Sequence, residues 1–306
     1  MMLSLRDALA TVRIHSPESF SLLGRREAAA SLTDGLAESL YAHLHCRMPL
    51  DSRALPAFAN WAGSRDFVQR LSDANGGTGC WQQGWLVRGR EADGRVVVER
   101  RGIRYWTAAG TTRPGTAAVG SEVAVRLPRE YRDMVPGFYL ALGNADDVRD
   151  TTPILRVYWN VASRAAPTLV GALTRELNQA GIPFQLKALT EPLRYDRVDP
   201  VVLYLAQSDY RRAFGPLEGV YVSMRGWLRA PVSLLVWRIG HGVGVAEDPG
   251  DGSSFGEHRS RILARLLVDH PDRFEEELIG LGYSLDGLFR NPGSREEYPR
   301  FEHHVV

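Results

Sequence analysis

The chain of 306 residues lacks the features that mark several classes of protein. Its two cysteines, Cys46 and Cys80, are far apart and form no C-x-x-C pair. This argues against a zinc knuckle, an iron–sulfur cluster or a disulfide scaffold, and it favours a reducing compartment. No apolar run approaches the roughly 20 residues of a membrane-spanning helix. The N-terminus has no basic segment followed by an apolar stretch, so we expect a cytoplasmic location.

Net charge is also nearly absent. The chain has 37 basic and 36 acidic residues, a formal net charge of +1. The net charge therefore gives no sign of the excess of basic residues that is typical of nucleic-acid-binding proteins. Hydrophobic residues make up 44% and charged residues 24%, which is typical of a folded globular protein and excludes intrinsic disorder. We expect one large or two ordinary domains that bind neither nucleic acid nor membrane.

Lysine is almost missing. Lys187 is the single lysine, and the other 36 basic residues are arginine. A GC-rich genome would explain a preference for arginine, but not why one lysine remains. Arginine stays protonated in proteins, whereas a lysine can lose its proton when it is desolvated or placed near other cations. Lys187 is therefore a candidate base.

The hydrophobic pattern predicts an α+β fold. A leucine every fourth residue from 32 to 44 predicts a buried helical stripe that ends near Cys46, with His43 and His45 in structural roles where a helix C-terminus favours cations. Residues 81–127 have the period of short strands, with a hairpin turn at Asp93-Gly94. Further strands are expected over 154–160, 184–189 and 201–206, and helices over 167–180, 256–269 and 271–281. We expect a helical and β-meander region over 1–145 and a mixed-sheet region over 146–306.

Polar side chains share faces on two of the predicted strands. Because alternate residues of a strand point to the same side, Arg156, Tyr158 and Asn160 lie together. Gln185 and Lys187 share a face in the same way. If the two strands are neighbours, a guanidinium, a phenol, an amide and the only ammonium converge on one surface.

Two more arginines, Arg194 and Arg197, follow in the loop before the next strand and could join this surface. Arginine forks match the oxygens of a phosphate, and a phosphomonoester carries about −1.5 to −2 charges. The surface therefore suits a phosphate group. The alternative interpretation is a solvated polar face of a half-covered sheet.

A second cluster spans residues 246–259. Ser254 and Glu257 have the spacing of a capping box, which places His258 and Arg259 in a first helical turn. Free N–H groups and the positive dipole end at that position favour an anion. The acidic loop before it lacks the D-x-D-x-D-G spacing of a calcium site. His241 lies in a glycine-rich loop, where a simple turn histidine is the alternative.

Together these segments resemble the HopA-type effector family. The resemblance is carried by Leu127–Glu130, Pro136–Gly143, Arg156–Asn160, Phe184–Lys187, Ala246–Arg259 and Asn291–Ser294. It covers most of the chain, and the acidic-glycine loop with its Phe-Gly-x-His-Arg continuation is the most specific part. Actinobacterial members of the family act as lyase subunits of class V lanthipeptide and related thioamitide pathways. The family is also distantly similar to the phosphothreonine lyases of enterobacterial type III effectors, which implies a phosphothreonine-lyase-like C-terminal half.

The resemblance implies a lyase of ribosomal peptide biosynthesis. Such an enzyme eliminates phosphate from phosphoserine or phosphothreonine in a precursor peptide and leaves dehydroalanine or dehydrobutyrine. It implies a precursor with a leader and a phosphorylated core as substrate, and a separate aminoglycoside-phosphotransferase-like kinase as partner. No cofactor or metal is required. Residues 1–145 would dock the peptide or the kinase.

The expected roles follow from both lines of argument. β-Elimination needs a base, which we assign to Lys187, and groups that hold and protonate the leaving phosphate. The groups expected to hold the phosphate are Arg156, Arg194, Arg197 and Arg259. The distant relatives use a Lys-x-His strand where this chain has Arg156-Val157-Tyr158, so the acid is left open among Tyr158, His258 and His241. Asn160, Asp251 and His241 are candidate substrate contacts.

Two other functions compete with this one. A phosphopeptide-binding or kinase-adaptor protein without chemistry would use the same arginines but would not need a titratable lysine. A metal-dependent enzyme could use His241, Asp248 and His258, but these residues lack the usual spacing of metal ligands.

Overall fold

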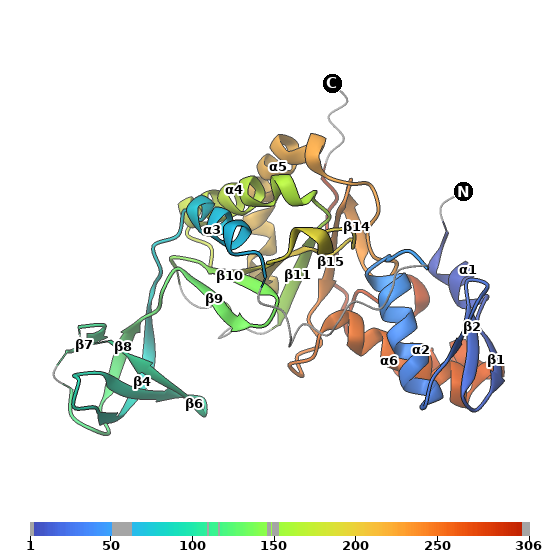
Figure 1. The fold of residues 1–306 in the computed structure, drawn as a ribbon, viewed down its shortest axis with the longest axis horizontal. Helices are drawn as coiled ribbons and strands as arrows, with labels where there is room; N and C mark the ends of the chain where they lie inside the picture. Colours follow the sequence, from blue (N-terminus) through green and yellow to red (C-terminus); the bar gives the residue numbers. More distant parts are fainter. Residues whose placement is uncertain are drawn as a thin grey trace.

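The computed structural model describes residues 3–50, 63–108, 110–115, 117–145, 148 and 153–301. Within these ranges the chain forms three antiparallel sheets with helices packed around them (Figure 1). This confirms the predicted α+β class. No helix in the described part is long and apolar enough to cross a membrane.

The central sheet has seven strands in the order β14-β15-β11-β13-β12-β10-β9. Its strands are β9 (Glu130–Val135), β10 (Phe138–Leu142), β11 (Ile154–Trp159), β12 (Phe184–Leu189), β13 (Val201–Ala206), β14 (Trp237–Gly240) and β15 (Val243–Glu247). The three strands expected from the sequence in this region are confirmed to within one residue. They are rich in β-branched and aromatic residues, which pack well on a pleated surface.

One face of this sheet is apolar. Its central rows are formed by Val157, Leu203 and Leu186 and their neighbours, which are fully buried. Helices α3 (Arg65–Ala74), α4 (Ala166–Gln179) and α5 (Tyr210–Met224) pack in sequence on this side (Figure 1). Helix α4 ends as predicted, with Gly181 at a φ of 61° after its last turn.

The other face is covered by segments from the two ends of the chain. Helix α2 (Leu32–Leu40) continues into one π-helical turn, η1 (Tyr41–His45), and packs along α6 (Phe255–Asp269) (Figure 1). The predicted leucine stripe is confirmed, since Leu36, Leu40 and Leu44 are fully buried. The π turn is a local widening that the leucine spacing does not reveal, and such turns are frequent at functional sites.

Smaller elements complete this side. They are α1 (Leu5–Leu9), the three-stranded sheet β1 (Arg13–Ser16), β2 (Ser19–Leu22) and β3 (Arg25–Ala28), and α7 (Phe274–Gly280) after the 3-10 turn η8 (Pro271–Arg273). The helix expected over 271–281 is thus split into a 3-10 turn and an α-helix. Other 3-10 turns are η4 (Ser163–Ala165), η5 (Pro192–Arg194), η6 (Gln207–Asp209), η7 (Arg225–Trp227) and η9 (Leu285–Gly287).

The third sheet stands apart from the central sheet (Figure 1). It has the order β6-β5-β4-β8-β7. Its strands are β4 (Trp81–Arg90), β5 (Val96–Arg100), β6 (Ile103–Thr107), β7 (Thr112–Arg113) and β8 (Glu122–Arg126). It has a small core of its own, centred on Val87, Val98 and Val125. The hairpin turn at Asp93-Gly94 is confirmed, with Gly94 at a φ of 84°.

Strands from both sides of residue 145 build the central sheet. β9 and β10 precede the boundary that the sequence predicts between 1–145 and 146–306, and β10 pairs with β12 beyond it. Residue 146 itself lies outside the described residues. The division into an accessory and a catalytic region stays a prediction.

Candidate active site

Lys187 and Arg156 lie on the same face of the central sheet, but not on adjacent strands. β13 lies between β11 and β12. The two rows across these strands are Tyr158–Val202–Lys187 and Arg156–Tyr204–Gln185. Since neighbouring strands are about 4.8 Å apart, the backbones of the two outer strands are separated by about 10 Å. The predicted shared face is therefore confirmed, with one more strand between its members than we assumed.

Lys187 is a largely buried ammonium. Its Nζ lies 3.7 Å from the centre of the Phe138 ring, on the neighbouring strand β10. The pKa of Lys187 is lowered to about 8. Burial is the largest cause, and the nearby Arg156 and Arg197 also lower this pKa, while Asp199 and Glu257 raise it in part. With that pKa, roughly a tenth of the side chain is neutral at pH 7. Lys187 can thus accept a proton near neutral pH.

Arg156 joins the sheet to the acidic-glycine loop. Its Nε donates to Asp248 at 2.7 Å, and one terminal nitrogen donates to the Ser253 carbonyl at 2.8 Å. The guanidinium stacks over the Tyr204 ring at 5.3 Å and is only 8% exposed. Arg156 therefore places a fixed positive charge at the start of α6.

Tyr158 lies in the same row as Lys187 and next to Arg156. Its side chain is buried and lies close to the Arg156 guanidinium. Burial raises the pKa of the Tyr158 phenol well above its ordinary value, although Arg156 lowers it in part. The phenol therefore keeps its proton at neutral pH and can donate it to an anion.

Arg197 and Asp199 form a buried ion pair beneath this face. The Arg197 guanidinium donates to Asp199 at 2.6 Å, to the Tyr41 hydroxyl at 2.9 Å and to Cys46 Sγ at 3.0 Å. The ion pair outweighs burial and keeps the pKa of Asp199 below its ordinary value, so Asp199 is ionised. Arg197 thus ties the end of α2 and η1 to the loop before β13, and its phosphate role stays a prediction.

Arg194 lies close to this pair. It ends the short turn η5 and is only 4% exposed. Burial and then the nearby Arg197 lower the pKa of Arg194. Two guanidiniums thus lie close together, and the role of Arg194 as a phosphate ligand stays a prediction.

His45 lies at the centre of the cluster, although the sequence indicated only a histidine at a helix end. Its Nδ1 is 2.9 Å from Ser233 Oγ, its Nε2 is 3.6 Å from Asp199, and its ring meets that of Tyr158 edge-on at 5.6 Å. Burial lowers the pKa of His45 to about 4. His45 is therefore neutral, which corrects the expectation of a cation at the helix end.

Arg259 is fully buried, and its guanidinium is used inside the fold. Its five N–H groups donate to the Leu288 carbonyl, His258 Nδ1, the Tyr283 hydroxyl, the Arg290 carbonyl and Asn291 Oδ1. In this arrangement Arg259 holds the segment 288–291 against α6. Its assignment as a phosphate ligand stays a prediction, and it would require some of these bonds to open.

The start of α6 differs from the sequence prediction. Ser254 occupies the N-cap position, but its side chain makes no capping hydrogen bond, so the predicted capping box is wrong. Arg156 fixes the approach to the helix instead, through the carbonyl of Ser253. In the first turn, His258 Nε2 lies 3.7 Å from Asp251, and burial and Arg259 lower the pKa of His258.

Three other predicted site residues lie at the margins of this face. The side-chain amide of Asn160 donates to the Pro231 carbonyl at 2.8 Å and accepts from Arg229 at 2.9 Å, so it is tied to the segment after η7. Asp251 is exposed and accepts hydrogen bonds from Ser253. His241 lies in the β14–β15 turn, and its backbone N–H donates to Tyr221 of α5, on the apolar side. Their roles as substrate contacts stay predictions.

No metal centre is found in the described part of the chain, where no group of three or more His, Cys, Asp or Glu side chains could hold an ion. The three residues considered for such a site have other partners. Asp248 pairs with Arg156, His258 faces Asp251, and the His241 backbone contacts α5.

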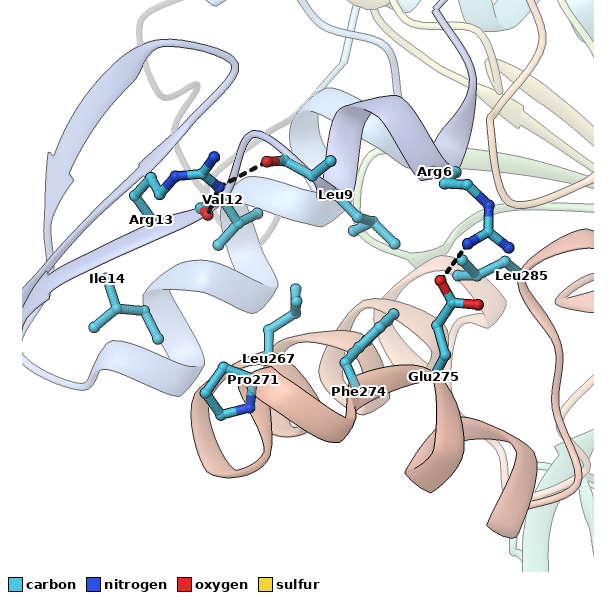
Figure 2. A pocket seen from close by; sticks show the side chains of 11 residues that line it. Arg6, Leu9, Val12, Arg13, Ile14, Leu267, Pro271, Phe274, Glu275 and Leu285 are labelled. Atoms are coloured by element: carbon cyan, nitrogen blue, oxygen red, sulfur yellow. Dashed lines mark hydrogen bonds and ion pairs between the residues drawn. The ribbon is translucent and has the colours of Figure 1, made fainter.

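A hollow of different character lies between the first helix and α6–α7. It is about 530 Å³ in volume and is lined mainly by apolar side chains such as Leu9, Leu267 and Phe274 (Figure 2). Its charged groups lie at the ends, where Arg6 forms an ion pair with Glu275 (Figure 2). The carboxylate in this hollow, that of Glu275, is paired with Arg6, so the polar face of the central sheet is the better candidate for chemistry.

Sequence reasoning missed several members of the polar face. Tyr204 could have been found, because it shares a face with Val202 on a strand that was correctly predicted. The Arg197-x-Asp199 spacing could have suggested an ion pair. His45 and Phe138 gave no local signal, because their positions depend on pairing with distant segments.

Comparison with known proteins identifies the family. No curated protein matches the chain. Two solved effector proteins are similar to it. That of Pseudomonas syringae pv. tomato strain DC3000 is 13% identical over 85% of this chain and 97% of that chain, with a TM-score of 0.47. That of Pseudomonas syringae pv. syringae strain 61 is 15% identical over 84% and 94%, with a TM-score of 0.49. The sequence model of the HopA1 effector protein family matches residues 130–285. This match includes the strands that carry Lys187, Arg156 and Tyr158, and the chain belongs to the HopA1 effector protein family.

Proposed function

We propose that this protein is a phosphoserine/phosphothreonine lyase that eliminates phosphate from a phosphorylated peptide. The observation that carries the proposal is the single lysine of the chain. Lys187 is partly buried on a sheet face that it shares with Arg156 and Tyr158, and this burial lowers its pKa to about 8. A buried ammonium is costly, and an arginine would serve phosphate binding as well. A group that must gain and lose a proton accounts for lysine at this position.

The reaction needs no co-reactant. Neutral Lys187 takes the proton from the α-carbon of the phosphorylated residue, and the electron pair of that C–H bond forms the Cα=Cβ double bond. The Cβ–O bond breaks, and the phosphate leaves with its electron pair. The leaving oxygen takes one proton from an acid of the protein, which gives hydrogen phosphate and dehydroalanine or dehydrobutyrine. Lys187 and the acid then recover their original states by exchange with solvent.

Arg156 and the start of α6 supply the positive potential for the phosphate. Arg156 is fixed by Asp248 and Tyr204, so its charge is preorganised. The first turn of α6 has no side-chain cap, and free N–H groups at a helix N-terminus favour an anion. Because Asp248 neutralises part of the Arg156 charge, we expect Arg194 to add to the binding.

Tyr158 is the acid that the geometry supports best among the three candidates. It shares a row with Lys187, and its buried phenol stays protonated at neutral pH. It also lies on the same strand face as Arg156, the positive charge that would hold the phosphate. His258 faces the exposed Asp251, and the His241 backbone contacts the apolar side of the sheet.

The proposed substrate is a precursor peptide in ribosomal, lanthipeptide-type biosynthesis, phosphorylated by a separate aminoglycoside-phosphotransferase-like kinase. Such a kinase uses ATP, so the cytoplasm is the proposed site of action. The resemblance to the lyase subunits of class V lanthipeptide pathways supports this assignment, together with the base, cation and phenol on one face.

Release of inorganic phosphate from synthetic phosphoserine and phosphothreonine peptides tests the proposal. We expect phosphate release with an equal yield of dehydrated peptide, detected by mass spectrometry and by thiol addition to the new double bond. Lys187→Arg keeps the charge but loses the base, so it should abolish elimination while phosphopeptide binding remains measurable. Arg175→Ala, at an exposed position of α4, is the control and should retain activity.

The outcomes also separate the lyase from a phosphopeptide-binding adaptor. Binding without phosphate release by the wild-type protein would favour the adaptor. Normal turnover by the Lys187→Arg variant would refute Lys187 as the base.

A further inference from the structure

Among the residues that the structure describes, the five-stranded sheet has one open edge. β7, at one end of the sheet, is only two residues long and is followed by Pro114, which blocks further pairing. β6, at the other end, is five residues long and pairs with β5 along one side (Figure 1). Ile103 and Trp106 of β6 are 63% and 52% exposed. An exposed edge with large apolar side chains is a ready template for another strand.

Positive charge is concentrated on this sheet. Residues 81–127 hold eight arginines and four acidic residues, a net charge of +4 in a chain whose total is +1. The rest of the chain is therefore slightly acidic. This sheet also lies outside the residues matched by the family model, 130–285, so its surface is a separate feature of the chain.

Two arginines of this sheet share a single acidic partner. Arg104 on β6 and Arg88 on β4 donate to the same carboxylate, that of Glu99, at 3.0 Å each. A single carboxylate thus pairs with two guanidiniums. The Arg104 side chain is 65% exposed and the Arg88 side chain is 45% exposed. Trp106 lies two residues from Arg104 and on the same face of the strand. The edge therefore combines a backbone with no strand partner in the described part of the chain, an indole and excess positive charge.

We propose that β6 binds an acidic, extended polypeptide segment as an additional strand of this sheet. The partner's backbone would pair with the outer edge of β6. Its carboxylates would face Arg104, on the face that also carries Trp106, and its apolar side chains would lie on the opposite face, beside Ile103. A nucleic acid could use the arginines but has no peptide groups to pair with the strand. A second copy of the chain would bring two Arg104 guanidiniums together, which like-charge repulsion opposes.

This inference goes beyond the proposed elimination and does not depend on it, because its measurement is binding. The probe is a fluorescein-labelled dodecapeptide of alternating glutamate and valine, titrated with the full-length protein by fluorescence anisotropy. We expect binding that weakens at least tenfold when lysine replaces glutamate in the probe. Binding should also weaken as the salt concentration rises, because exposed charges are screened. Hydrogen exchange at residues 103–107 should slow in the complex.

The variants locate the site. Arg104→Glu should weaken binding about tenfold or more, and Trp106→Ala by several-fold, with unchanged thermal stability. Arg265→Glu makes the same charge reversal at a 78% exposed position of α6 and should leave binding unchanged. Arg104→Gln serves if the charge reversal beside Glu99 prevents folding.

Three results would overturn the proposal. They are equal affinity for the glutamate and lysine probes, unchanged hydrogen exchange at residues 103–107, or tighter binding of a labelled dodecathymidylate than of the acidic peptide. The last result would assign the same arginines to single-stranded nucleic acid instead.

Discussion

The two faces of the central sheet are built from the same strands but have different tasks. On the side of α4 and α5, residues such as Val157, Leu186 and Leu203 are fully buried in an apolar layer. On the other side, the same three strands present Arg156, Tyr204 and Lys187 to segments from both ends of the chain. Alternation along a strand thus lets one sheet carry a core on one face and charged groups on the other. Substitutions on the apolar face should therefore lower stability, whereas substitutions on the polar face should lower the proposed activity.

The sharpest test of this difference is Lys187→Met. Methionine matches the length of the lysine stem, so packing is kept while the proposed base is lost. Elimination should fall by about 10²–10⁴-fold, the usual contribution of a general base. Because the folded state holds the pKa of Lys187 at about 8, below that of the unfolded chain, replacing this lysine should raise stability at pH 7 by about 1–3 kcal/mol. Phosphate release and chemical denaturation measure the two effects.

A substitution on the opposite face is the matched control. Leu203→Ala should cost about 2–5 kcal/mol of stability, since Leu203 is fully buried in the apolar layer. The folded fraction of this variant should keep its turnover rate. A loss of stability in Lys187→Met as large as that in Leu203→Ala would contradict the assignment of stability to the apolar face and of the proposed activity to the polar face.

The second test concerns how closely α6 covers the polar face. A Cβ at Gly256 would lie 2.2 Å from Cδ2 and 2.6 Å from Cγ of the His45 ring. Gly256→Ala should therefore destabilise the protein by about 1–3 kcal/mol, because the buried ring must move. Gly219→Ala, in α5, is the control: a Cβ there meets nothing within 4 Å, so it should stabilise by about 0.5–1 kcal/mol. Thermal denaturation of both variants checks the contrast, and equal effects would contradict it.

The smallest expected effect is a pH dependence of stability that arises from His45. Burial lowers the pKa of His45 from 6.5 to about 4 in the folded protein, so between these values the unfolded chain binds a proton that the folded chain does not. Stability is then fully present above pH 6.5 and is lost as the pH falls toward 4, by about 1 kcal/mol at pH 5.5. Urea denaturation at pH 7 and pH 5.5 measures this loss. His45→Gln should reduce it, and an unchanged pH dependence would show that His45 is not the group responsible.

Much of the central sheet could be predicted from the sequence, because strand alternation and apolar runs are local signals. The shared face of Arg156 and Tyr158, and that of Gln185 and Lys187, followed from the two-residue period alone. The strand between them did not, because the order of strands depends on pairing between distant segments. For the same reason the sequence assigned Arg259 to phosphate, whereas five partners spread over residues 258–291 occupy its N–H groups.

The packing of α2 and η1 against α6 has a consequence for folding during synthesis. The α2 segment leaves the ribosome well before α6, its packing partner. Until that partner emerges, Leu36, Leu40 and Leu44 have no α6 to pack against and stay available to chaperones or to other nascent chains. Contacts this distant in sequence also slow folding, since a long loop must close before they form. The polar face is therefore assembled only after α6 has been synthesised.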